Sequence, residues 1–137
     1  MKEKGFTLLE LLFTLSLVSL LLVLLVPIQS NFIKKMEEKA FFDLFHSDVL
    51  YIQNIAMTTP EVVSIHFEKN YYYIERGIRR LYKRKIPDSI TITNNAMEKI
   101  SFNYLGVIRY PGSILFNNGE EYIEYICPLG KGRCYFG

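Results

Sequence analysis

A run of 23 residues without a charged side chain, Leu11 to Ile33, most constrains what this chain can fold into. A helix rises about 1.5 Å per residue, so a run of this length matches the roughly 30 Å hydrocarbon core of a bilayer. The run lies near the amino terminus of a chain of 137 residues, and the roughly 100 residues after it carry most of the charge. The sequence therefore predicts a membrane anchor joined to one further domain.

Composition excludes several classes of protein. The chain has 16 Lys and Arg against 14 Asp and Glu, a net charge of +2, and half of its residues are apolar. A disordered acidic or basic chain would have a larger charge imbalance and fewer apolar residues. Two Cys are too few for a disulfide-dense mini-domain or a multi-thiolate zinc site.

The amino terminus differs from an ordinary secretory signal. A short basic leader with Lys2 and Lys4 ends at Gly5, and the apolar run begins at once with Phe6. No small-residue cleavage pattern follows the run, as a secretory signal would require. Glu10 lies inside this otherwise Leu-rich segment, where a carboxylate is costly unless it is paired, neutral or near the interface. Cleavage after Gly5 would give Phe6 a new amine that could neutralise the Glu10 of a neighbouring subunit.

The segment Gly5-Phe6-Thr7-Leu8-Leu9-Glu10, followed by the long apolar run, resembles the prepilin signature. This signature is shared by type IV pilins, type II secretion pseudopilins and competence pseudopilins. The resemblance implies cleavage between Gly5 and Phe6 by a prepilin peptidase, N-methylation of Phe6, and a role for Glu10 in subunit docking. The alternative is a plain signal-anchor helix in which Glu10 reaches the membrane interface.

The resemblance also implies where the protein lies and what it meets. Lysines flank the apolar run on both sides, so charge alone leaves its orientation open. The family places the amino terminus in the cytoplasm, in a single-pass membrane protein that reaches the cell surface after assembly. The implied partners are other major and minor pseudopilins, the prepilin peptidase, the pilus assembly platform and membrane lipid.

A long helix is expected to continue beyond the apolar run. No Gly occurs between Phe6 and Thr59, and Pro60 disfavours helix at the residue before it. Pro27 is the interior breaker, either a tolerated membrane proline or a hinge that loosens on assembly. We expect a leader at 1–5, a membrane and assembly half of the helix at 6–33, and an amphipathic half at 34–59. The face expected to pack on a sheet comprises Phe41, Leu44, Phe45, Val49, Ile52, Ile55 and Ala56, and it also includes an unexplained acid, Asp48.

Residues 60–137 are expected to form an antiparallel β domain. Alternating or β-rich runs are separated by turn signals such as Lys69-Asn70 and Asn117-Asn118-Gly119, without an intervening helix. The expected strands are 62–67, 71–75, 78–86, 90–92, 100–104, 107–110, 114–116 and 122–126. The fold class is therefore α+β, a long helix on an antiparallel sheet, and this matches the architecture of pilins.

Two Cys near the carboxyl terminus leave two interpretations open. Cys127 and Cys134 bracket a short loop with two Gly, which favours a tight reversal that brings the thiols together. A disulfide could persist outside the membrane. The rival interpretation is two unpaired thiols that behave as small apolar side chains.

A basic cluster interleaved with tyrosines also has two interpretations. Lys and Arg bind phosphates and aromatic rings stack on bases, so weak contact with DNA is conceivable. Cations on an edge strand also prevent edge-to-edge pairing, and we favour this interpretation because charge elsewhere is balanced. The cluster comprises Arg76, Arg79, Arg80, Lys83, Arg84 and Lys85.

No catalytic, metal or cofactor site is expected. His46 and His66 lie on different elements, without nucleophiles or carboxylates at informative spacings. Gly130-Lys131-Gly132-Arg133 lacks the full phosphate-loop pattern and the helix that should follow it. We expect a protein that is the substrate of an enzyme, not an enzyme.

Within the pilin class, the chain is most similar to ComGD-type minor competence pseudopilins of Gram-positive bacteria. The similarity rests on Ile65-His66-Phe67 with Tyr71-Tyr72-Tyr73, and on the late Gly130–Arg133 hairpin. It implies a surface pilus that captures DNA for uptake in transformation. The alternatives are a type II secretion minor pseudopilin and an anchored binding module that never polymerises.

Overall fold

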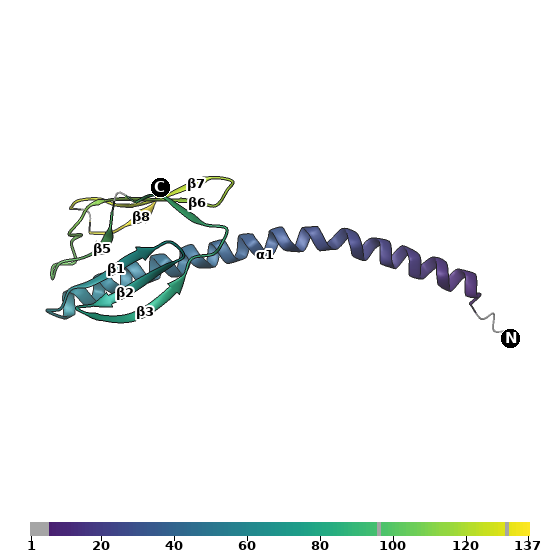
Figure 1. The fold of residues 1–137 in the computed structure, drawn as a ribbon, viewed down its shortest axis with the longest axis horizontal. Coiled ribbons are helices and arrows are strands. Elements are labelled where there is room, and N and C mark those ends of the chain that lie inside the picture. The colour runs from purple at the N-terminus through teal and green to yellow at the C-terminus, as the bar shows by residue number, and fades with distance from the viewer. Residues whose placement is uncertain (1–5, 96, 131) are drawn as a thin grey trace. The chain divides into compact units, whose positions relative to one another are not determined.

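The chain consists of one long helix followed by eight strands. The computed structural model describes residues 6–95, 97–130 and 132–137, apart from the side chains of 24–30, 94 and 95. Two compact units are distinguished, Met1–Met36 and Glu37–Gly137, and each is described by itself. Helix α1 (Leu8–Thr58) contributes to both units, and all the strands belong to the second (Figure 1).

Helix α1 ends close to the residue that the sequence indicates. Its last residue is Thr58, and Pro60 follows two positions later. Pro27 lies within α1, but its side chain is outside the described part of the structure. Among the described residues, no helix has the length and apolar character required to cross a bilayer.

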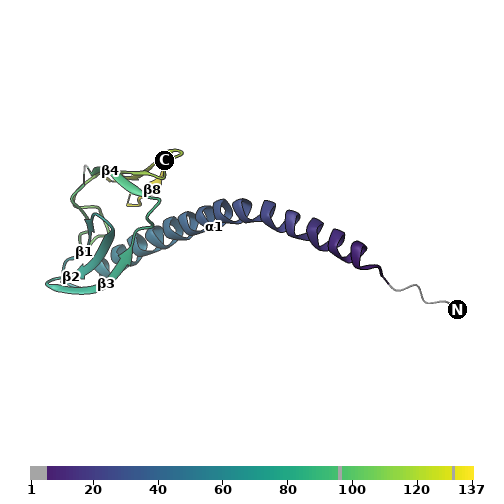
Figure 2. The ribbon, with the colours of Figure 1, turned by 45° about the vertical axis from the view of Figure 1, so that its right-hand side comes forward.

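The strands form two antiparallel sheets, not the one sheet expected from the sequence. Sheet A has the order β3-β2-β1-β5, and sheet B has the order β4-β6-β7-β8 (Figures 1 and 2). The chain leaves sheet A after β3 at Ile86-Pro87, where the proline has no N–H to donate to a ladder. The strands are β1 (Val63–Glu68), β2 (Tyr71–Arg76), β3 (Arg79–Lys85), β4 (Thr91–Asn95), β5 (Lys99–Ser101), β6 (Gly112–Asn117), β7 (Tyr122–Cys127) and β8 (Tyr135–Phe136).

One expected strand was wrong and one strand was missed. Residues 107–110 do not form a strand, because the chain reverses tightly after β5 and pairs only through the isolated bridge of Phe102 and Ile108. Pro111 then removes the next backbone donor. Strand β8 was not expected, since it has only two residues and pairs with the end of β7.

The core of the second unit forms around α1. Phe41, Phe45, Val49, Ile52 and Ala56 are all buried, at helical spacings of three and four residues. Phe45 is fully buried, and its ring centre lies 5.4, 5.5 and 5.0 Å from those of Tyr72, Phe116 and Tyr125, which come from both sheets. Leu44, which the sequence placed on this face, is 41% exposed, and Ile55 is only partly buried. The expected α+β fold, a helix packed on antiparallel strands, is confirmed for this unit.

Candidate functional site

The first candidate site is the start of α1. Phe6 is exposed, and the helix begins two residues later at Leu8. Thr7 caps the helix: its carbonyl oxygen accepts from the Leu11 N–H at 3.1 Å, and its Oγ1 accepts from the Glu10 N–H at 3.3 Å. Gly5, the expected residue before the cleavage site, lies outside the described residues together with the rest of the leader.

The geometry adds a local role for Glu10 that the sequence reasoning missed. With Thr7 at the N-cap, Glu10 occupies the third helical position, so Thr7-Leu8-Leu9-Glu10 has the pattern of a capping box. A carboxylate in the first turn also interacts favourably with the positive end of the helix dipole. The sequence does contain the signal for a capping box, which is Thr-x-x-Glu before an apolar run.

The basic cluster lies on β3, the edge strand of sheet A, except for Arg76, which is the last residue of β2. Most of its cations have a partner of opposite charge within the same unit. Arg80 pairs with Glu75 at 3.0 Å and Arg84 with Asp48 at 3.1 Å, and Lys85 pairs with Asp88 at 3.0 Å. These pairs leave less free positive charge for phosphates than the sequence suggests.

The tyrosines beside β3 contact cations as well. The Nζ of Lys83 lies 3.8 Å from the centre of the Tyr71 ring, and the guanidinium of Arg80 lies 4.2 Å from that of Tyr73. Cation–π contacts of this kind occupy the ring faces on which a base would stack. Across the described residues, the Arg79 side chain has no hydrogen bond or ion pair. The arrangement therefore fits a charged edge strand that resists pairing with another edge.

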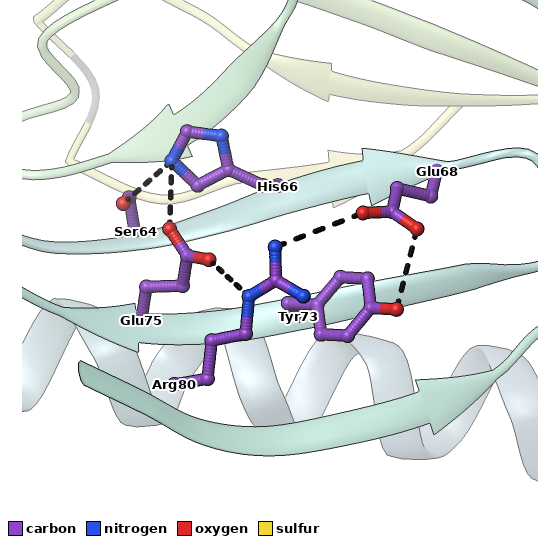
Figure 3. A network of polar contacts seen from close by, with 6 residues as sticks. All are labelled: Ser64, His66, Glu68, Tyr73, Glu75 and Arg80. Atoms are coloured by element: carbon purple, nitrogen blue, oxygen red, sulfur yellow. Dashed lines mark hydrogen bonds and ion pairs between the residues drawn. The ribbon is translucent and has the colours of Figure 1, made fainter. Parts of the chain in front are cut away.

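A polar network covers the outer face of sheet A (Figure 3). The Nε2 atom of His66 lies 3.1 Å from Ser64 Oγ and 3.5 Å from Glu75 Oε2. A nucleophile–base–acid relay needs the serine and the carboxylate on opposite ring nitrogens, because one nitrogen takes the proton while the other is held by the acid. Since both partners here share one nitrogen, this set does not have the geometry of a catalytic triad.

The sequence analysis did not predict that Ser64 and Glu75 lie close to His66. Ser64 and His66 lie two residues apart on β1, and the β1–β2 register places Glu75 opposite Ser64. Folding the hairpin about the Lys69-Asn70 turn would have revealed this pairing. On the same face, the Tyr73 hydroxyl donates to Glu68 at 3.2 Å, and Arg80 lies 3.8 Å from Glu68.

Asp48, for which the sequence offered no explanation, anchors sheet A to the helix. It is buried and accepts from the Tyr72 hydroxyl at 2.7 Å and from Arg84 Nε at 3.1 Å. Burial and this hydrogen bond raise the pKa of Tyr72, so its hydroxyl stays a donor. Arg84 therefore has a structural partner in Asp48 and is not a free charge on the surface.

The carboxyl-terminal segment is attached to both β7 and α1. Cys127 and Cys134 are joined by a disulfide, with their Cα atoms 4.2 Å apart, and both are buried. The Gln53 side-chain amide donates to the carbonyl oxygens of Gly106 and Gly132. Lys131, in the segment Gly130-Lys131-Gly132-Arg133, lies outside the described residues.

We expect replacement of Cys127 and Cys134 by Ser to lower the free energy of unfolding by about 2 to 3 kcal/mol. A disulfide across this short separation removes roughly that much chain entropy from the unfolded state. Urea denaturation of the full chain in detergent, followed by circular dichroism, measures the change. Unchanged mobility on reducing and non-reducing gels, with two thiols open to labelling, would contradict the disulfide itself.

Comparison with known proteins gives one match. Residues 1–26 match the prokaryotic N-terminal methylation motif, the signal of type IV pilins and pseudopilins. The motif implies processing by a prepilin peptidase, anchoring in a membrane and assembly with other pilins. No match to a curated protein or to a solved structure was found for this chain. Within the described ranges, no group of three His, Cys, Asp or Glu side chains could hold a metal ion.

Proposed function

We propose that this chain is a minor pseudopilin of a competence pilus, cut after Gly5 and N-methylated on Phe6. The observation that carries the proposal is the methylation motif at residues 1–26. A helix packed on antiparallel strands in the second unit is consistent with it. The competence role is supported by the similarity in sequence of Ile65-His66-Phe67, Tyr71-Tyr72-Tyr73 and Gly130-Lys131-Gly132-Arg133 to ComGD-type pseudopilins.

The mechanism has three steps. The precursor lies in the membrane as a single-pass protein, with its leader in the cytoplasm and its β domain outside. The peptidase removes Met1–Gly5 and exposes the Phe6 amine. Glu10 and the apolar helix then dock against other pilin helices, and the charge pair between Glu10 and a neighbouring amine favours assembly. The β domain is displayed on the fibre at the cell surface.

The character of the first unit supports a bilayer or a helix bundle as its surroundings. Its described side chains are exposed and most of them are apolar, and a helix with so much exposed apolar surface is normally buried in a membrane or an assembly. The hydroxyls of Thr14, Ser16 and Ser19 donate to carbonyl oxygens three residues earlier, at 2.9, 2.7 and 2.8 Å. These polar groups therefore need no water.

The proposal includes no catalytic activity and no cofactor for this chain. The shared Nε2 contact of His66 supports a structural role for the outer network of sheet A. The charge pairs of β3 likewise support an edge-protecting role for Arg80, Arg84 and Lys85 over DNA contact.

The test is peptide mass spectrometry of the amino terminus, on chain from its native host with and without the prepilin peptidase. We expect a mature chain that begins at methylated Phe6 only when the peptidase is present. A chain that keeps Met1–Gly5 beside an active peptidase would contradict the processing step. It would favour the anchored binding module that never polymerises.

The choice between competence and type II secretion needs a second measurement. A strain without this gene should lose transformation if the chain serves DNA uptake, while secretion of exported proteins stays unchanged. Loss of secretion with normal transformation would favour the secretion pseudopilin instead. The surrounding genes, from a competence or a secretion operon, give an independent answer.

A further inference from the structure

The helix starts very close to the bond that the proposed peptidase cuts. The methylation motif covers this segment, and the proposed cut lies before Phe6. Phe6 and Thr7 are not helical, and the first helical residue is Leu8, at the purple end of α1 in Figure 1. Two non-helical residues therefore separate the proposed cut from the helix.

One hydrogen bond sets this starting point. In a helix each N–H donates to the carbonyl oxygen four residues earlier, so a helix that began sooner would direct the Glu10 N–H to Phe6. In the structure the Glu10 N–H donates to Thr7 Oγ1 at 3.3 Å instead. The Leu11 N–H already follows the helical pattern and donates to the Thr7 carbonyl oxygen at 3.1 Å. The Thr7 hydroxyl thus takes the donor that would draw Phe6 into the helix.

The residues before Thr7 offer a different stopping point. Phe6 has no side-chain acceptor, whereas Gly ranks near Thr as an N-cap residue. Without the Thr7 hydroxyl, the next acceptable N-cap toward the amino terminus in the sequence is Gly5. A helix capped there would include Phe6 as its first residue.

Such a shift would engage the bond to be cut. A peptidase has to reach the carbonyl group of that bond and polarise its oxygen with its own donors. The carbonyl oxygen of an N-cap residue already accepts the first bond of the helix. With Thr7 as the N-cap, this first bond goes to the Thr7 carbonyl oxygen, which lies beyond the proposed cut.

We propose that Thr7 is a positioning residue for removal of the leader. Its hydroxyl binds the Glu10 N–H and so keeps the Gly5–Phe6 bond outside the helix and open to the peptidase. The step is hydrolysis: water adds across this amide, the C–N bond breaks, Gly5 ends as a carboxylate and Phe6 gains the amine. The inference rests on the proposed function and deepens it, because it assigns one residue of this chain to the processing step.

The test measures cleavage of the full chain in detergent micelles by purified prepilin peptidase, with Thr7→Val as the variant. Val keeps the β-branched shape of Thr and lacks its oxygen. Loss of an N-cap residue changes a helix equilibrium about 2-fold to 30-fold. We expect KM to rise by a factor in this range with kcat unchanged, because an enzyme that binds only the open form meets less of it.

Two matched variants show whether the cap is responsible. Thr7→Ser keeps the hydroxyl and is an equally good N-cap residue, so it should restore the KM of the parent chain. Thr14→Val removes the same kind of hydroxyl from the interior of α1, where it donates to the Leu11 carbonyl oxygen at 2.9 Å. This substitution should leave KM unchanged.

A second measurement follows the helix start without the peptidase. The carbonyl carbon-13 chemical shift of Phe6, recorded on the same full-length samples, distinguishes helical from non-helical backbone. We expect a non-helical value in the parent chain and in Thr7→Ser, and a change toward the helical value in Thr7→Val.

Three results would overturn the inference while the parent chain is cut. They are an equal KM for Thr7→Val and the parent, a KM for Thr7→Ser as high as that for Thr7→Val, and a lower kcat at unchanged KM. The last result would mean that Thr7 acts in the transition state through contact with the peptidase. A parent chain left uncut by active peptidase contradicts the proposed function instead, and the Phe6 shift then still shows whether the Thr7 hydroxyl sets the start of α1.

Discussion

Glu10→Gln should leave removal of Met1–Gly5 intact and lower recovery of the chain in assembled fibres about tenfold to a hundredfold. A hydrogen bond to a charged group contributes about 1.5 to 3 kcal/mol, and each 1.4 kcal/mol is a factor of ten. Gln keeps the capping position at the helix start, because a capping box accepts Glu or Gln at its third position. The loss would therefore report the charge of Glu10 and not the helix cap.

The matched control is Thr7→Ala, which removes the cap and keeps the charge. Loss of an N-cap costs about 0.5 to 2 kcal/mol of helix stability, and this should reduce assembly less than loss of the charge does. Cleavage is scored by mass spectrometry and assembly by the fraction in sheared fibres. Normal assembly of Glu10→Gln beside poor assembly of Glu10→Ala would assign Glu10 to helix capping and refute its pairing with an amine.

The sequence revealed those features of the fold that depend on local pattern. The spacing of Phe41, Phe45, Val49 and Ile52 predicted the buried face of α1, because helical periodicity can be recognised in the sequence without any structure. The end of α1 followed from the effect of Pro60 on the residues before it. Leu44 was placed wrongly on that face. It lies at the edge of the apolar stripe, and whether a side chain there is buried depends on how far the sheets extend over the helix.

Features that depend on pairing between distant segments were harder to predict. The division into two sheets depends on which strand β5 joins, and β5 pairs with β1 although more than thirty residues separate them. Two of the acids that pair with the basic cluster come from distant elements, since Asp48 lies on α1 and Glu68 on β1, and these pairs could not be predicted from the sequence around the cluster. The His66 contacts were recoverable in principle, since one hairpin register determines them.

Asp48→Ala should lower the free energy of unfolding by about 2 to 3 kcal/mol, a large share of the 5 to 15 kcal/mol typical of a domain. The substitution leaves the buried Tyr72 hydroxyl without its acceptor, which costs about 1 to 3 kcal/mol. Arg84 also loses its partner, but its side chain is 35% exposed, so water replaces much of that interaction.

A double-mutant cycle separates the two partners of Asp48. Tyr72→Phe removes the hydroxyl and should cost about 1 kcal/mol by itself. If the hydroxyl carries most of the effect, Asp48→Ala in the Tyr72→Phe background should cost clearly less than in the parent chain. Equal costs in both backgrounds would show that the hydroxyl is not what Asp48 stabilises.

The matched surface control is Asp88→Ala, for which we expect no measurable change in the free energy of unfolding. Lys85 and Asp88 also form an ion pair at 3.0 Å, but both side chains are more than half exposed. Urea denaturation of each full-length variant in detergent, followed by circular dichroism, supplies the comparison. A loss at Asp88 as large as that at Asp48 would contradict burial as the source of the difference, because the two pairs have nearly the same distance.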